Sequence, residues 1–361
     1  MNPHAKRTLA LAHIAAAIAC LATTDVVAQR SAGKSAATSK ASSAPLVWPL
    51  PPEQPRIRYV RSYQGVNDFK PTKKPSKLAL MLLGPQDAGA SSDTLLKPYG
   101  VAVSKQGRVY VADTAARRAF VFDPDAQVVT FVGEDGPGKL TKPIGVAVDD
   151  GGVAFVADAT LKRIFGYSPD GRLQIAIGHD GELSNPSGLT IDRVNHRLYV
   201  ADSAKHQVLC YSTLDGSPQQ TIGRRGAENG EFNFPTNLTV DRSGRLYVAD
   251  TLNFRIQIFD AAGQFLKAFG ELGDSLGSFN RPKGVGVDSE GHVYVIDASF
   301  NNFQIFDEEG QLLLFVGSGG RNPGEFFLPA GVSVDEEDRI YVADQGNSRV
   351  QVFQYIHGAT K

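Results

Sequence analysis

A short motif returns six times along this chain of 361 residues, and its regular spacing restricts the fold more than any other feature. Each copy has a tyrosine or phenylalanine, then valine, then Ala-Asp or Ile-Asp. The copies end at aspartates that follow one another at intervals of 44 to 48 residues: Asp113, Asp158, Asp202, Asp250, Asp297 and Asp344. A proline opens each unit 15 or 16 residues before its aspartate: Pro98, Pro143, Pro186, Pro235, Pro282 and Pro329. A fixed period of this length indicates one supersecondary unit stacked beside copies of itself.

Every unit divides into four short strands separated by turn residues. In the fourth unit, for example, a strand after Pro235 leads to a turn at 241–244, and the second strand ends at Asp250. Two further strands follow, at 255–260 and just before Gly270. Four strands in about 45 residues match a propeller blade, and no unit has the 3.6-residue period of a helix. We therefore predict an all-β fold, a six-bladed β-propeller of four-stranded antiparallel blades.

The consensus Pro-x-Gly-Val-x-Val-Asp, followed by Gly-x-Tyr-Val-Ala-Asp-x-x-Asn-x-Arg-Ile-Gln-Val-Phe, resembles the signature of NHL repeats. The fourth and sixth units match it most closely, and both contain the full Asn-x-Arg, at 253–255 and 347–349. The resemblance covers residues 97–354 and implies a six-bladed propeller. It leaves several functions open, because NHL-like propellers include binding scaffolds, RNA-binding domains and an amidating lyase whose metal is held by histidines.

The sixth unit lacks a fourth strand, because the pattern stops at about Phe353. A matching strand is present near the N-terminus, where residues 59–64 align with 265–270 of the fourth unit. We predict that residues 56–64 complete the sixth blade, which closes the ring and removes an exposed sheet edge. Closure is expected to bury four apolar or aromatic side chains: Ile57, Tyr59, Val60 and Tyr63.

The first 28 residues have the pattern of a secretory signal peptide. Two basic residues precede an apolar run at 9–22, which is too short to cross a bilayer comfortably, and small residues predict cleavage after Ala28. A second interpretation stays open, because 17–20 loosely resembles a lipobox and would make Cys20 a lipidated N-terminus. We expect an exported protein, periplasmic or extracellular, that contacts a membrane only if Cys20 is lipidated.

The other boundaries follow from composition and from the repeat. Residues 29–45, rich in Ala, Ser and Lys, predict a flexible tether, and 46–65 hold the closing strand. The long link at 66–96 is either a spacer or a lid over one face of the ring. The propeller occupies 97–356, and 357–361 form a tail. The blades are expected to start near residues 98, 143, 186, 235, 282 and 329.

Charge and cysteine content exclude some functions. The net charge is −1, and removal of residues 1–28 makes it −2, so there is no overall basic field to hold nucleic acid, and we expect no nucleic-acid partner. Two cysteines are too few for a disulfide framework. Cys210 occupies an apolar position in a third strand, where we expect a core residue rather than a nucleophile.

Candidate binding residues are found where a unit departs from the repeat, because the fold itself explains what all six copies share. We expect the six aspartates to accept main-chain N–H bonds within their turns, or to pair with an arginine five residues later. Departures on the same face, near the channel mouth, form an aromatic and polar patch: Tyr99, Asn237, Lys283, Phe300 and Asn302. Sequence drift on exposed loops is the alternative explanation of these residues.

Enzymatic function has little support in the sequence. There is no Gly-x-Ser-x-Gly elbow, phosphate loop or His-Glu-x-x-His motif. Only His179 and His206 map to the aspartate-bearing face, and they are too few for a metal site without a carboxylate such as Asp202. We predict a non-catalytic binding or scaffold module for a protein or peptide partner, without a cofactor. The alternative is a lyase or lactonase with one divalent metal, Zn or Ca, at the channel mouth.

Overall fold

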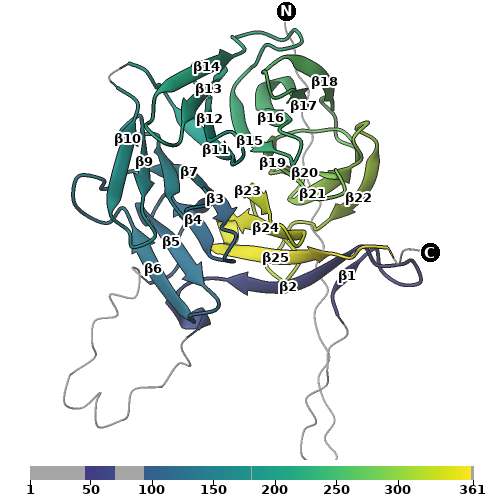
Figure 1. The fold of residues 1–361 in the computed structure, drawn as a ribbon. Coiled ribbons are helices and arrows are strands. Elements are labelled where there is room, and N and C mark those ends of the chain that lie inside the picture. The colour runs from purple at the N-terminus through teal and green to yellow at the C-terminus, as the bar shows by residue number, and fades with distance from the viewer. Residues whose placement is uncertain (1–44, 70–92, 180, 359–361) are drawn as a thin grey trace, which may run out of the picture. The chain divides into compact units, whose positions relative to one another are not determined.

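Six small antiparallel sheets are arranged around a common centre in the computed structural model (Figure 1), which describes residues 45–69, 93–179 and 181–358. Five sheets have four strands that follow one another in the chain, and the sixth is completed by strands from the N-terminal part. The predicted six-bladed β-propeller is confirmed. The predicted signal peptide with Cys20, the tether as far as residue 44 and the centre of the 66–96 link lie outside the described residues.

Each blade runs from an inner strand near the centre to an outer strand. Blades one to three contain, four to a blade, β3 (Pro98–Val103), β4 (Val109–Asp113), β5 (Arg118–Asp123), β6 (Val128–Val132), β7 (Pro143–Val148), β8 (Ala154–Asp158), β9 (Arg163–Tyr167), β10 (Leu173–Ile177), β11 (Pro186–Asp192), β12 (Arg197–Asp202), β13 (Gln207–Ser212) and β14 (Pro218–Ile222). Blades four to six contain β15 (Pro235–Val240), β16 (Leu246–Asp250), β17 (Arg255–Phe259), β18 (Phe265–Phe269), β19 (Pro282–Val287), β20 (Val293–Asp297), β21 (Asn302–Phe306), β22 (Leu312–Val316), β23 (Pro329–Val334), β24 (Arg339–Asp344) and β25 (Arg349–Tyr355).

The remaining elements are short. Strands β1 (Val47–Trp48) and β2 (Ile57–Tyr63) precede the blades, and 3₁₀ helices occupy η1 (Val66–Asp68), η2 (Thr251–Asn253) and η3 (Gln345–Asn347). Within the described ranges, no helix has both the length and the apolar character needed to span a membrane.

The core lies between the blades rather than at the centre of the ring. One cluster, for example, joins Tyr199 and Val208 of blade three to Leu238 and Val248 of blade four. Inner strands are therefore buried on both faces, and strand β16 has no exposed residue. Fourth strands such as β18 alternate between half-buried and exposed residues, because only one of their faces meets a neighbouring blade.

The repeated Pro-x-Gly lets the inner strands approach one another closely. A Cβ added to Gly145 would lie 2.0 Å from the carbonyl oxygen of Ser187 in the next blade. Equivalent glycines in four other blades would place a Cβ 2.4 to 2.8 Å from the matching carbonyl: Gly100, Gly188, Gly284 and Gly331. The glycine is therefore required by the distance between blades. Blade four has Asn237 at this position.

The ring is closed by hydrogen bonding between the two ends of the propeller. Strand β2 pairs antiparallel with β25, from Ile57 opposite Tyr355 to Tyr63 opposite Val350. Ile57 and Tyr63 are buried in the blade-six interfaces. Strand β1 adds a fifth strand outside β2, which the repeat pattern did not predict, and Trp48 packs edge-on against Phe353 with ring centroids 5.7 Å apart.

The expected burial of Val60 is wrong, because its side chain is 44% exposed. Val60 lies at a register shift between Tyr59 and Arg61, where β2 has one residue more than β25. The extra residue of a bulge is left unpaired. Leu266 in blade four lies at the corresponding shift and is also exposed, so the alignment of the two strands is correct although the burial is not.

Two further expectations concern Cys210 and the long link. Cys210 is a buried free thiol, and burial raises its pKa to about 11, so its role as a core residue is confirmed. The described ends of the link lie side by side, because Val66 N–H donates to Asp93 O and Leu95 N–H donates to Gln64 O. The lid and spacer interpretations both concern residues 70–92, which are outside the described ranges.

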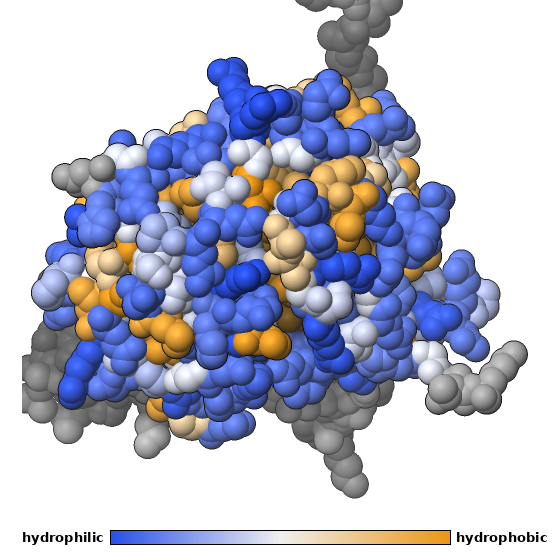
Figure 2. Space-filling model, turned by 45° about the horizontal axis from the view of Figure 1, so that its top comes forward, coloured by the Kyte–Doolittle hydropathy of each residue, from blue (hydrophilic) through white to orange (hydrophobic). Residues whose placement is uncertain are grey.

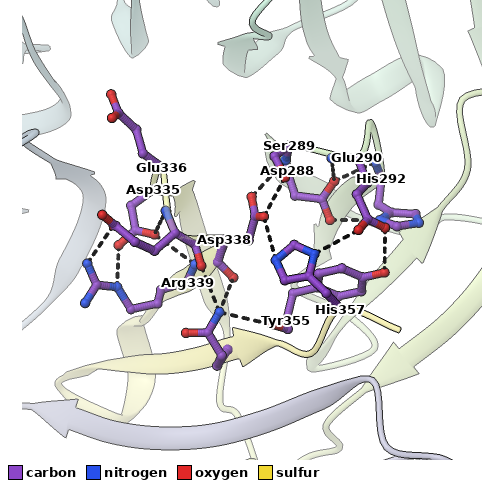
Figure 3. A network of polar contacts seen from close by, with 12 residues as sticks. Asp288, Ser289, Glu290, His292, Asp335, Glu336, Asp338, Arg339, Tyr355 and His357 are labelled. Atoms are coloured by element: carbon purple, nitrogen blue, oxygen red, sulfur yellow. Dashed lines mark hydrogen bonds and ion pairs between the residues drawn. The ribbon is translucent and has the colours of Figure 1, made fainter. Parts of the chain in front are cut away.

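The C-terminal tail is held across blades five and six by a network of polar contacts (Figure 3). His357 Nδ1 lies 2.8 Å from Glu290 Oε1, and its Nε2 lies 3.2 Å from Asp338 Oδ2. Asp338 also accepts hydrogen bonds from the Ser289 N–H and hydroxyl. Four blades have glycine where blade six has Asp338, which adopts a left-handed conformation with φ of 58°. This departure from the repeat joins two blades and the tail through one carboxylate.

Hydrogen bonding to Glu290 raises the pKa of His357, and the same contact lowers the pKa of Glu290. Hydrogen bonding to Asp288 similarly raises the pKa of His292, while burial and, to a smaller extent, Arg56 oppose that change. A histidine with a raised pKa stabilises the fold below its ordinary value of 6.5, and the effect is lost as pH rises through the raised value. A glutamate with a lowered pKa stabilises above 4.5, and its effect is lost as pH falls through the lowered value. The tail contact is therefore strongest between about pH 4.5 and 6.5.

Replacing Gly145 with alanine should destabilise the ring, because the new methyl group overlaps a main-chain carbonyl that cannot rotate away. We expect the melting temperature to fall by roughly 5 °C, equivalent to about 1–3 kcal/mol. Gly319→Ala is the control, because its added Cβ meets no atom closer than 3.7 Å. Equal melting curves for the two variants would contradict the close approach of the inner strands.

Replacing His357 with alanine should lower the melting temperature more at pH 5.5 than at pH 8.5. The expected difference at pH 5.5 is about 2 °C, because solvent screens a half-exposed pair and limits its contribution to less than about 1 kcal/mol. His179→Ala, at an exposed loop position, controls for the loss of a histidine side chain outside this network. A loss of the same size at both pH values would show that the tail contact does not depend on the charge of His357.

Candidate functional site

The six repeated aspartates mark one face of the ring, called here the aspartate face. All six are fully buried: Asp113, Asp158, Asp202, Asp250, Asp297 and Asp344. Asp158 is paired in register with Pro143, which opens the same blade, and the other five blades repeat this pairing. Each first strand therefore begins at the aspartate face. The turns between first and second strands lie at its other end, called here the turn face.

The aspartates fix the loops of their face. In blade two, Asp158 Oδ2 accepts hydrogen bonds from the N–H groups of Thr141 and Lys142, in the loop that enters the blade. Its Oδ1 accepts from Thr160 and Leu161, in the loop between the second and third strands. Main-chain donors therefore occupy both carboxylate oxygens, which confirms the expected structural role of the repeated aspartate.

Blades four and six, which carry the full Asn-x-Arg, use side chains in place of some main-chain donors. Asp250 Oδ2 accepts from Asn253 Nδ2 at 2.8 Å, Arg255 Nε at 2.9 Å and Gln257 Nε2 at 3.0 Å. Blade six repeats the arrangement around Asp344. Burial raises the pKa of both aspartates, although these hydrogen bonds act in the opposite direction.

The side-chain contacts change how the preceding loops enter blades four and six. Phe234 adopts a left-handed conformation with φ of 60°, and its N–H donates to His206 Nδ1 at 3.0 Å. Leu328 does the same with φ of 51°, donating to Asn301 Oδ1 at 2.8 Å. The departures from the repeat in blades three and five therefore supply acceptors to the next blade.

Three of the five predicted patch residues lie at the inner rim of the aspartate face. Lys283 of blade five reaches past blade six to Tyr99 of blade one, with Nζ 3.3 Å from the phenolic oxygen and 4.9 Å from the ring centroid. The intervening blade has the small residue Ala330 at this position. Asn237 lines the central cavity together with Tyr99, and its Oδ1 accepts from the Leu238 N–H.

The other two predicted patch residues are not brought to this rim. Asn302 is only 5% exposed and lies opposite Asp297 in the strand register, where blades four and six have arginine. Its Oδ1 has no hydrogen-bond partner in the described part of the chain. Phe300 is half-buried in the loop before β21, where its N–H donates to Asp297. Neither side chain lines the central cavity.

A cavity of about 850 Å³ occupies the centre of the ring and is lined by the first strands of the blades. Tyr99, Ile144, Ser187 and Asn237 line its aspartate-face end, and the turns between first and second strands line its other end. This volume lies within the usual range of ligand pockets.

Arg193 crosses the turn-face end of this cavity. The side chain comes from blade three, and its Nη2 lies 3.2 Å from Val103 O and 3.4 Å from Val148 O, in blades one and two. Its Nε lies 3.4 Å from Asp150, and its Nη1 lies 3.5 Å from Glu336 in the opposite blade. Lys105 completes the bridge from blade one at 2.7 Å from Asp150.

The aspartate face also exposes large apolar side chains from its fixed loops. Six of them, called here the apolar rim, are 37 to 50% exposed: Leu96, Leu161, Phe234, Leu252, Phe327 and Leu328. Their own main chains are held in the aspartate hydrogen-bond networks or next to them. In a space-filling view of one side of the molecule, exposed hydrophobic side chains gather in separate patches among hydrophilic ones (Figure 2).

The alternative metal ligands are already engaged elsewhere. Asp202 accepts main-chain N–H bonds from Ser184 and Asn185, and His206 Nδ1 accepts the bond from Phe234. His179 is an exposed loop residue. Among the residues that the structure describes, no three His, Cys, Asp or Glu side chains form a group suited to a metal ion.

Sequence reasoning missed Arg193 and the tail contact of His357. The turn at 192–196 is one residue longer than the corresponding turns of the other blades, and this extra length could have drawn attention to Arg193. For the tail contact, the informative feature was Asp338, which stands where four other blades have glycine.

Comparison with known proteins identifies the repeat. The family model described as NHL repeat matches four segments, in blades three to six: 183–211, 232–259, 279–306 and 328–353. NHL repeat-containing protein 2 of Gallus gallus is 34% identical over 95 residues, which is 24% of this chain and 13% of that protein. Peptidyl-glycine alpha-amidating monooxygenase B of Xenopus laevis is 37% identical over 91 residues, covering 24% of this chain and 10% of that protein. The matches thus span only a small part of each relative.

Solved structures of low sequence identity share the fold alone. A gluconolactonase from Xanthomonas campestris has a TM-score of 0.57 at 18% identity, covering 73% of this chain and 87% of its own. Virginiamycin B lyase from Staphylococcus aureus has a TM-score of 0.54 at 15% identity, and the match covers 72% of this chain and 80% of the lyase chain. An auxiliary nutrient binding protein from Bacteroides thetaiotaomicron has a TM-score of 0.56 at 15% identity, and the match covers 73% of this chain and 70% of that protein.

Four matched segments, a repeat motif that recurs in the two remaining blades and six sheets around one centre lead to the same conclusion. The chain is an NHL-repeat β-propeller.

Proposed function

We propose that this propeller is an exported, non-catalytic binding module that holds a protein or peptide partner on its aspartate face. The observation that carries the proposal is the apolar rim, whose side chains are exposed although their loops are fixed. Rigid exposed apolar groups favour association, because little conformational entropy is lost when a partner covers them.

The strained loops point to the same face. Phe234 and Leu328 are bulky residues in the left-handed region, which non-glycine residues seldom adopt. Both side chains belong to the apolar rim. Such strain is maintained only when surrounding contacts enforce it, and it is often found at binding sites.

The runner-up function is a metal-dependent lyase or lactonase with its site at the channel mouth. Propeller enzymes of these kinds share the fold, as the gluconolactonase and the lyase illustrate. The described residues offer no ready group of three ligands, so this function would need ligands to rearrange. We therefore favour binding over catalysis, with no nucleic acid as partner.

Export and anchoring are part of the proposal. Cleavage after Ala28 would release a periplasmic or extracellular protein, and lipidation of Cys20 would anchor it to a membrane. The mass of the mature N-terminal peptide separates these outcomes, because a lipidated cysteine adds the mass of its acyl chains. An intact Met1 in the exported fraction would contradict both.

Removing apolar groups from the rim should weaken peptide binding. We expect a displayed random-peptide library to yield binders of the wild-type protein that bind Leu252→Ser/Phe327→Ser at least about fivefold more weakly. Leu266→Ser/Leu313→Ser is the matched control, because its two leucines are about as exposed but lie on outer strands. No selected binders, or equal loss in both double variants, would count against the aspartate face.

Metal analysis tests the runner-up. Protein purified without chelator should contain far less than one equivalent of Zn or Ca. His206→Asn is the informative variant, because asparagine retains an acceptor for Phe234 N–H, as Asn301 does for Leu328. A stoichiometric metal in the wild type that disappears in His206→Asn would replace the binding proposal with the enzymatic one.

A further inference from the structure

A charged side chain crosses one end of the central cavity. Arg193 spans the turn-face end, from blade three to carbonyl oxygens of blades one and two and to Glu336 in the opposite blade. Its charge is met by Asp150 and Glu336, so the bridge is a neutralised cross-link.

At the aspartate-face end, the cation is not neutralised. Among the described residues, Lys283 makes no ion pair with a carboxylate, and its polar partner is the Tyr99 hydroxyl at 3.3 Å. The repeated aspartates are fully buried and engaged by other donors. An ammonium group over an aromatic ring is stabilised only modestly compared with a desolvated ion pair. The mouth of the cavity thus has a positive charge available to a ligand.

One further donor accompanies this charge. The Tyr99 hydroxyl can donate a proton, because an ammonium group beside it offers no acceptor. Thr236 of blade four donates its hydroxyl to the main-chain carbonyl of Lys283, which holds the first strands of blades four and five together at this end of the cavity.

We propose that Lys283 and Tyr99 form a carboxylate-binding subsite at the aspartate-face end of the central cavity. An ammonium group and a hydroxyl without a fixed negative charge beside them select a ligand group that only accepts hydrogen bonds. The inference rests on the proposed function: the carboxylate is an acidic side chain or the C-terminus of a peptide whose apolar residues contact the apolar rim. Lys283 then exchanges its contact with the Tyr99 ring for an ion pair.

Short synthetic peptides distinguish the two sources of the carboxylate. The probes are acetyl-tetraglutamate amide, with side-chain carboxylates only, acetyl-tetraglutamine with a free C-terminus, and acetyl-tetraglutamine amide, which is neutral. Calorimetric titration at low salt should show that at least one charged probe binds about tenfold or more tightly than the neutral probe. Equal binding of all three probes, or no binding of either charged probe, would overturn the subsite.

Variants separate this subsite from general attraction to positive charge. Lys283→Met should weaken the charged probe about tenfold or more, and Lys283→Arg should restore most of its affinity. Lys139→Met is the control, because Lys139 is an exposed lysine in a loop between blades, away from the cavity. Equal losses in Lys283→Met and Lys139→Met would overturn the inference. Unchanged melting curves confirm that the variants remain folded.

The subsite and the proposed function can fail separately. If library peptides bind through the apolar rim but their affinity is the same in Lys283→Met, the subsite is refuted and the binding function stands. If the charged probe binds through Lys283 while the rim variant retains every library peptide, the subsite stands as a small-carboxylate site and the proposed peptide-binding face is refuted.

Discussion

The buried carboxylate of each blade is the contact on which the rest of the structure depends. It accepts hydrogen bonds from the loop that enters the blade and from the loop inside it, as Asp158 does from Lys142 and Thr160. An ionised carboxylate without such partners would be costly to bury, so both loops must adopt the conformation that satisfies it. The fixed positions of the exposed side chains at the mouth of the ring follow from this requirement.

Most of the fold could be predicted from the sequence, because each blade repeats the same local information. The proline and aspartate of every unit mark a strand start and a strand end, and the glycine of five units marks a close approach between blades. Burial in β2 was less predictable. Val60 was expected to be buried because it is apolar, but a bulge adds one residue to the strand at this point, and Val60 is exposed.

Less of the candidate site could be predicted, because its contacts join blades that are distant in sequence. The departures from the repeat at Tyr99 and Lys283 are visible in the sequence. Their contact is not, because the lysine side chain must extend past blade six, where the equivalent residue is the small Ala330. Asn302 departs from the repeat at a buried position, so a departure alone does not indicate accessibility. His206 was a metal ligand only in the enzymatic alternative, and in the structure its Nδ1 accepts a hydrogen bond from Phe234 N–H of the following blade.

The joint between β2 and β25 has a consequence for how the molecule is made. Ile57 and Tyr355 are about 300 residues apart in the sequence. Strand β2 can therefore pair with β25 only after nearly all of the chain has been synthesised. Contacts of such long sequence separation form slowly, and until then both sheet edges can pair with another molecule. Two chains that exchange these strands would satisfy the same hydrogen bonds as one chain that closes on itself. A higher protein concentration during folding would therefore favour exchange of these strands between two chains over closure within one chain.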